Sequence, residues 1–102
     1  MAKELLLSAI KEILGIITLD QKNEENPNLT ELVYGVFDKN VEATIGFGKK
    51  EFCERIEKSK WVEVGYYGEA KVTPEGANVL DKIEAGEDLE DILAQWRDCL
   101  DK

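Results

Sequence analysis

Histidine is absent from this chain of 102 residues, and cysteine occurs only at Cys53 and Cys99. His–Cys zinc sites, histidine general bases and Ser-His-Asp triads are therefore excluded. The chain also has no G-x-G-x-x-G, P-loop or G-x-S-x-G string, the patterns that hold phosphates or a nucleophilic serine. Paired carboxylates remain open as a source of catalysis, but nothing singles out one pair. We therefore expect no enzyme, no cofactor and no metal, and a protein that acts by binding.

Positive charge is scarce: 13 Lys and Arg stand against 22 Asp and Glu, for a formal net charge of −9. A charge of this sign repels nucleic acid and anionic lipid at long range, so any polyanionic partner must meet a local basic patch. The apolar residues, 43% of the chain, are interrupted too evenly by charge for a membrane span. We expect no membrane partner.

The length is that of one domain, 1–102. The start, MAKELLLSAIKEI, lacks the long apolar stretch and small-residue cleavage site of a signal peptide. We therefore expect a cytoplasmic protein, in which Cys53 and Cys99 are buried thiols rather than a disulfide.

Apolar residues recur every three or four positions in five segments, which predicts amphipathic helices. These segments are 3–19, about 30–37, 48–60, 74 to about 86, and 88–101. Residues 20–28 contain no apolar side chain and are expected to form a surface loop. The segment 61–72, with partial alternation around Gly65 and Gly68, predicts a β-hairpin. The segment 38–48 fits either a short β segment or the turn of a helix-turn-helix.

Two helix starts have identifiable capping residues. Either Asn28 or Thr30 is available to cap the second helix, and Thr73 with Pro74 forms a strong start for the fourth. We expect the last helix, in 87–102, to be a C-terminal addition to the domain. Its apolar stripe predicts either a homodimer seam or a lid packed over the first helix; the stripe consists of Leu89, Ile92, Leu93, Trp96 and Leu100. Trp61 and Trp96 are both expected to be core residues.

The order of helices, hairpin and helix start carries a family resemblance. The stretch FCERIEKSKWVEVGYYGEAKVTPEGANVLDKI resembles the second half of a winged-helix domain of the MarR/PadR-like kind, in which a Gly-bearing wing leads into a T-P-E-G helix start. The resemblance implies an α+β winged helix-turn-helix, with three helices and a short hairpin wing, extended by C-terminal amphipathic helices. It also implies a DNA-binding regulator of transcription or replication, whose helix at 48–60 enters the major groove.

The distribution of charge is compatible with that function. Residues 49–71 carry six cations against five acids, whereas the segments on either side are strongly acidic. Contacts with duplex DNA are therefore expected from Lys49, Lys50, Lys58 and Lys71.

A different partner is equally consistent with the same segment. Glu54 and Glu57 lie on the outward face of the helix at 48–60, where each would face phosphate, so an acidic module that binds a protein is the alternative. Tyr66 and Tyr67 would then anchor the partner, although strand alternation is expected to turn one of them inward. A third interpretation, a solvated helix face with spaced opposite charges such as Glu54 and Lys58, fits as well as either.

Overall fold

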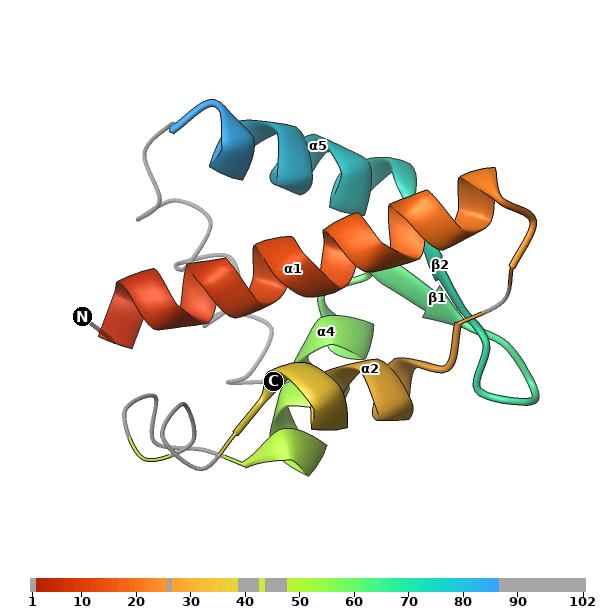
Figure 1. The fold of residues 1–102 in the computed structure, drawn as a ribbon, viewed down its shortest axis with the longest axis horizontal. Coiled ribbons are helices and arrows are strands. Elements are labelled where there is room, and N and C mark those ends of the chain that lie inside the picture. The colour runs from red at the N-terminus through yellow and green to blue at the C-terminus, as the bar shows by residue number, and fades with distance from the viewer. Residues whose placement is uncertain (1, 26, 39–42, 44–47, 87–102) are drawn as a thin grey trace.

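The structure, a computed structural model, describes residues 2–25, 27–38, 43 and 48–86 (Figure 1). This part of the chain is an α+β fold of four helices and one antiparallel hairpin. The predicted fold class, α+β, is therefore confirmed. Its elements are α1 (Ala2–Lys22), α2 (Leu29–Val36), α4 (Lys49–Lys58), β1 (Val62–Val64), β2 (Ala70–Val72) and α5 (Pro74–Glu84). The expected C-terminal helix, with its stripe of Leu89, Ile92, Leu93, Trp96 and Leu100, lies outside the described residues. So do Cys99 and almost all of 38–48.

Helix α1 is the central element and packs against α2, β2 and α5 (Figure 1). Its predicted apolar stripe is fully buried at Ile10, Ile13, Leu14 and Ile17. Across the core, the rings of Phe37 and Phe52 join the end of α2 to α4, with centroids 4.8 Å apart. No helix in the described part of the chain is both long and apolar enough to cross a bilayer.

The end of α1 differs from the prediction. Residues 20–22 were expected to begin the loop, but they form the last turn of the helix, which reaches Lys22. The turn is polar and largely exposed and therefore has no apolar periodicity to reveal it. A distant contact holds it: the side-chain oxygen of Gln21 accepts a 2.7 Å hydrogen bond from the amide of Val72.

Side-chain caps set the starts of two helices. Asn28, rather than Thr30, caps α2 by accepting a 3.1 Å hydrogen bond from the amide of Glu31. Thr73 caps α5 in the same way, with the amide of Gly76 as donor at 3.1 Å, and Pro74 occupies the first turn. The predicted start of α5 is confirmed.

The hairpin pairs Glu63 with Lys71 at its centre, between the pairs Val62–Val72 and Val64–Ala70. One expectation about it is wrong. Tyr66 and Tyr67 are both exposed, at 93% and 84%, so neither turns inward. They lie beyond the end of β1, in the turn closed by Gly68 at φ +84°, where strand alternation no longer applies.

Gly76 shows why the T-P-E-G string ends in glycine. A Cβ at this position would collide with the carbonyl of Trp61 and crowd Val72. Trp61 itself is 3% exposed, a core residue as predicted. The first turn of α5 therefore lies directly against the residue that precedes β1, and this contact fixes the position of α5 relative to the hairpin.

Candidate functional site

The outward face of α4 is mixed in charge, with acids in the majority. Phe52 and Ile56 are buried and orient the helix. Five exposed side chains then form the solvent-facing surface: Lys50, Glu51, Glu54, Glu57 and Lys58. This face therefore presents three carboxylates and two ammonium groups, although α4 as a whole carries more cations than acids.

The difference arises because two cations of α4 are held close to the protein. The guanidinium of Arg55 donates a 2.9 Å hydrogen bond to the carboxylate of Glu51. The ammonium of Lys49 lies 5.1 Å from the centroid of the Tyr34 ring on α2, and Lys49 is only partly exposed. Such a cation–π contact is weakly stabilising and holds the ammonium group of Lys49 against the ring of Tyr34.

The four lysines predicted to contact DNA are spread out. Lys49 and Lys58 mark opposite ends of α4, about 13 Å apart along the axis, with three glutamates between them in sequence. Lys71 lies on β2, where its direct cross-strand neighbour is Glu63. Lys50 and Lys58 each have Glu54 four residues away on the same helix.

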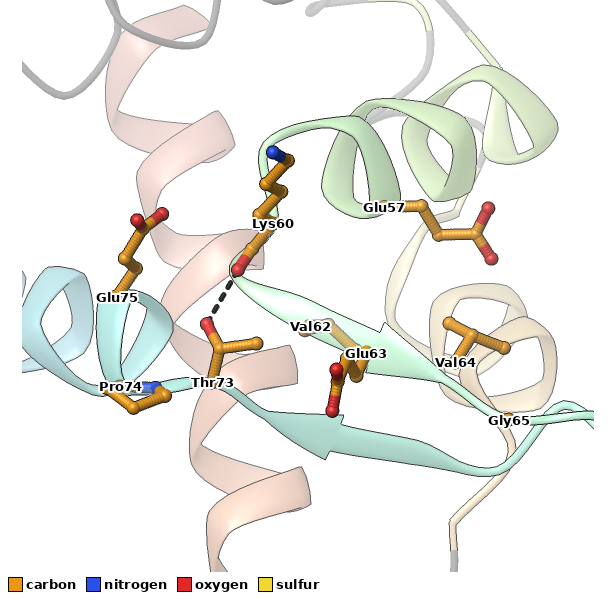
Figure 2. Close-up of a pocket in the computed structure, with 9 residues that line it drawn as sticks. All are labelled: Glu57, Lys60, Val62, Glu63, Val64, Gly65, Thr73, Pro74 and Glu75. Atoms are coloured by element: carbon orange, nitrogen blue, oxygen red, sulfur yellow. Dashed lines mark hydrogen bonds between the residues drawn. The ribbon is translucent and has the colours of Figure 1, made fainter.

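An open groove of about 920 Å³ lies where the end of α4, the strand β1 and the start of α5 meet (Figure 2). Its lining residues are Glu57, Lys60, Val62, Glu63, Val64, Gly65, Thr73, Pro74 and Glu75. Three of them are carboxylates and one is an ammonium group, and the two valines of β1 contribute the apolar part together with Pro74. Each of the three contributing elements supplies one glutamate.

The walls of the groove are tied together by Thr73. Its hydroxyl donates a 2.6 Å hydrogen bond to the carbonyl oxygen of Lys60, which Figure 2 shows as a dashed line. Its amide donates to the carbonyl of Trp61 at 3.0 Å. Lys60 adopts a left-handed conformation with φ +65°, a costly one for a residue with a side chain. The connection between α4 and β1 therefore has a defined shape that these hydrogen bonds maintain.

The turn of the hairpin presents an organised aromatic pair. The rings of Tyr66 and Tyr67 meet edge to face, with centroids 5.1 Å apart and planes at 83°. The amide of Tyr67 donates a 3.0 Å hydrogen bond to the Glu69 carboxylate, which holds the backbone of the turn. Two exposed aromatic rings on an ordered turn are suited to contact a partner, because little conformational entropy remains to be lost on binding.

Cys53, on α4, is a free thiol and only partly exposed. Burial, and then the negative charges of Glu57 and Glu54, raises the pKa of the Cys53 thiol from 9.0 to about 11. The thiol therefore stays protonated near neutral pH, which makes it a poor nucleophile. In the described part of the chain, no group of acidic or cysteine side chains is arranged to hold a metal ion.

The sequence had singled out Glu54, Glu57, Tyr66 and Tyr67 as one partner-binding set. In the structure Glu57 lines the groove, and Glu54 lies on the exposed face of α4 beside it. The groove itself, with Glu63 and Glu75, was missed. The alternation in 61–64, which turns Glu63 outward, was the only sequence signal for part of it.

Comparison of the chain with protein-family models, with curated proteins and with solved structures found no match.

Proposed function

We propose that this chain is a winged-helix-type binding module that engages a basic polypeptide partner through the face formed by α4 and the hairpin. The observation that carries the proposal is the groove, which Glu57, Glu63 and Glu75 line from three elements and in which Lys60 is the only cation among the lining residues. A site with this charge attracts lysine and arginine side chains and repels phosphate.

The winged-helix part of the proposal is supported by the order of the elements. Helix α4 leads into the short strand β1, a turn containing Gly68, the strand β2, and then a helix capped by Thr73. This is the order that the sequence resemblance implies. Because one fold serves many functions, the choice of partner has to come from the side chains of the face.

Charge and shape act together in the proposed contact. The net charge of −9 steers a cationic partner toward the module, and the glutamates of the groove then fix where its basic side chains bind. Tyr66 and Tyr67 extend the face beyond the groove and supply apolar contact area. We therefore expect the tyrosines to contribute mainly to the lifetime of the complex, and the carboxylates mainly to its rate of formation.

The test separates local charge from overall charge. A fluorescently labelled oligolysine peptide is titrated with the wild type and with two triple variants of equal net charge. One variant carries Glu57→Gln, Glu63→Gln and Glu75→Gln in the groove. The other carries Glu12→Gln, Glu31→Gln and Glu84→Gln at exposed positions that do not line it.

We expect the groove variant to bind the peptide at least about tenfold more weakly, a loss that corresponds to about 1.4 kcal/mol. The control variant should lose much less, because its charges act only at long range. Equal losses in both variants, or no binding by the wild type, would contradict the proposal.

A second function is supported by a different observation. Lys49 and Lys50 stand together at the start of α4, the helix that the resemblance would insert into a major groove, and α4 carries four cations in all. On this proposal the chain is a DNA-binding regulator. Replacing Lys49 and Lys50 with alanine should weaken binding to duplex of any sequence and lower the salt slope by about 0.9 per lost contact. A gel shift that the double substitution leaves unchanged would exclude this use of α4.

A further inference from the structure

The hydrogen-bond pattern of the hairpin defines which way the main chain of β1 points. The amide of Gly65 donates to the carbonyl of Glu69 at 2.8 Å, and the amide of Thr73 donates to the carbonyl of Trp61 at 3.0 Å. In an antiparallel ladder, hydrogen-bonded pairs alternate with pairs whose main-chain groups point outward. The central pair, which includes Glu63, is therefore bonded across the hairpin.

Both outward-pointing amides of β2 already have partners. The amide of Ala70 donates to the carbonyl of Pro27 at 2.8 Å, so the segment before α2 adds one bridge along this edge. The amide of Val72 donates to the side chain of Gln21 at the end of α1. On the β2 side of the sheet, the outward amides are thus hydrogen-bonded within the protein itself.

The opposite edge, on the β1 side, is different. There the amide and carbonyl groups of Val62 and Val64 point away from β2. Within the part of the chain that the structure describes, neither residue makes a hydrogen bond on that side. Val62 is 3% exposed, whereas Val64 is more accessible. The edge is therefore available chiefly at Val64, and both residues line the acidic groove (Figure 2).

An unpaired edge is a template for another strand, and proteins that leave one open commonly use it to bind an extended peptide. Successive side chains of such a strand point to opposite faces of the sheet. An added strand would run past Glu63 of β1 and past Glu57, which lines the groove from α4. Basic side chains of the added strand would therefore lie near carboxylates of the groove.

We propose that the β1 edge at Val64 pairs with an extended polypeptide segment rich in lysine or arginine, which adds a strand to the sheet along the groove. The inference rests on the proposed function and specifies its binding mode: main-chain hydrogen bonds to Val64 hold the segment, and the glutamates of the groove select its charge. A strand bound in this way leaves the exposed face of α4, and the turn that carries Tyr66 and Tyr67, free to contact the rest of the partner.

The experiment follows individual amides of the full chain by NMR. The probe is a terminally blocked peptide of about eight alternating lysine and valine residues, a length typical of a strand. At saturation we expect hydrogen exchange at the Val64 amide to slow by about tenfold or more, because it gains a hydrogen bond. The Gly65 amide is the internal control, since it is already bonded to Glu69 and should change little.

Two peptide variants and one pair of protein variants complete the test. N-methylation of every second residue, either of all lysines or of all valines, removes the main-chain donors on one edge of the peptide. One of these two methylated peptides should not bind, and the other should bind nearly as well as the original. A peptide with glutamate in place of lysine should not bind at all. Glu63→Gln should weaken binding of the original peptide severalfold, whereas Glu12→Gln, on α1 and outside the groove, should not.

The outcomes separate this inference from the function on which it rests. If the lysine peptide binds and its affinity depends on the glutamates of the groove, but exchange at Val64 is unchanged, the edge pairing is wrong and the proposed function stands. If no lysine peptide binds, both fail. Slower exchange at Val64 that depends on protein concentration without peptide would assign the edge to a second copy of the chain and overturn the inference.

Discussion

The hydroxyl of Thr73 links two turns of the chain, because it donates a 2.6 Å hydrogen bond to the carbonyl of Lys60 and accepts one from the amide of Gly76. One side chain therefore caps α5 and fixes the end of the α4–β1 connection. Thr73 also lines the groove, so the stability of the fold and the shape of the proposed site depend on the same residue.

Thr73→Val removes both hydrogen bonds while keeping the shape of the side chain. We expect a loss of about 1–2 kcal/mol in the free energy of unfolding, the usual cost of losing a helix cap. Thr73→Ser keeps the hydroxyl and should lose less than half as much. Urea denaturation measures both values. Equal losses in the two variants would mean that the hydroxyl contributes no more than the methyl group, which would contradict the role given to its hydrogen bonds.

Gly76→Ala tests the close approach of α5 to Trp61. The new Cβ would collide with a backbone carbonyl, which cannot move aside as a flexible side chain does. We expect a destabilisation of about 1–3 kcal/mol. Gly15→Ala in α1 is the matched control, since a Cβ there meets nothing within 4 Å, and it should stabilise the protein by about 0.4–1 kcal/mol. A neutral result at Gly76 would contradict the packing described for α5.

The reactivity of Cys53 reports the electrostatics of α4. In a Cys99→Ser background, the rate of alkylation by iodoacetamide should rise with a midpoint near pH 11 instead of near 9, because burial and two glutamates disfavour the thiolate. Glu57→Gln should move the midpoint down. The folded-state pKa exceeds the unfolded value, so this thiol stabilises the fold below pH 9 and the contribution is lost as the pH rises toward 11. A midpoint at 9 in the parent protein would show that the thiol is neither buried nor near these charges.

Tyr66→Ala and Tyr67→Ala should separate binding from folding. Both side chains are almost fully exposed, so the unfolding free energy should change by less than about 0.5 kcal/mol. If one of them anchors the partner, its removal should cost about 2 kcal/mol or more of binding, which is about thirtyfold in affinity. A partner protein whose affinity is the same for both variants and the wild type does not use the aromatic turn.

The sequence predicted the elements whose signals are local. Helical spacing located the buried faces of α1, α2 and α4, and the capping residue Thr73 located the start of α5. The end of α1 was not predictable in this way, because its last turn is polar and is held by the contact of Gln21 with β2, 51 residues further along the chain.

In the candidate site, too, local features could be predicted from the sequence and long-range contacts could not. Glu54 and Glu57 could be placed on an outward helix face from spacing alone. The groove depends on the left-handed residue Lys60 and its bond to Thr73, which bring the end of α4 and the start of α5 to either side of β1. Such long-range relationships leave no periodic pattern in the sequence.

The central claim is that the face of α4 and the hairpin binds a basic polypeptide, and the double variant Glu54→Gln/Glu57→Gln tests it most directly. Binding of an oligolysine peptide and of a random DNA duplex is measured side by side at low salt. The account predicts about tenfold weaker binding of the peptide by the variant and no binding of duplex by either protein. Unchanged peptide binding together with a gain in duplex affinity would contradict it, because the two carboxylates would then be acting only as a barrier to phosphate.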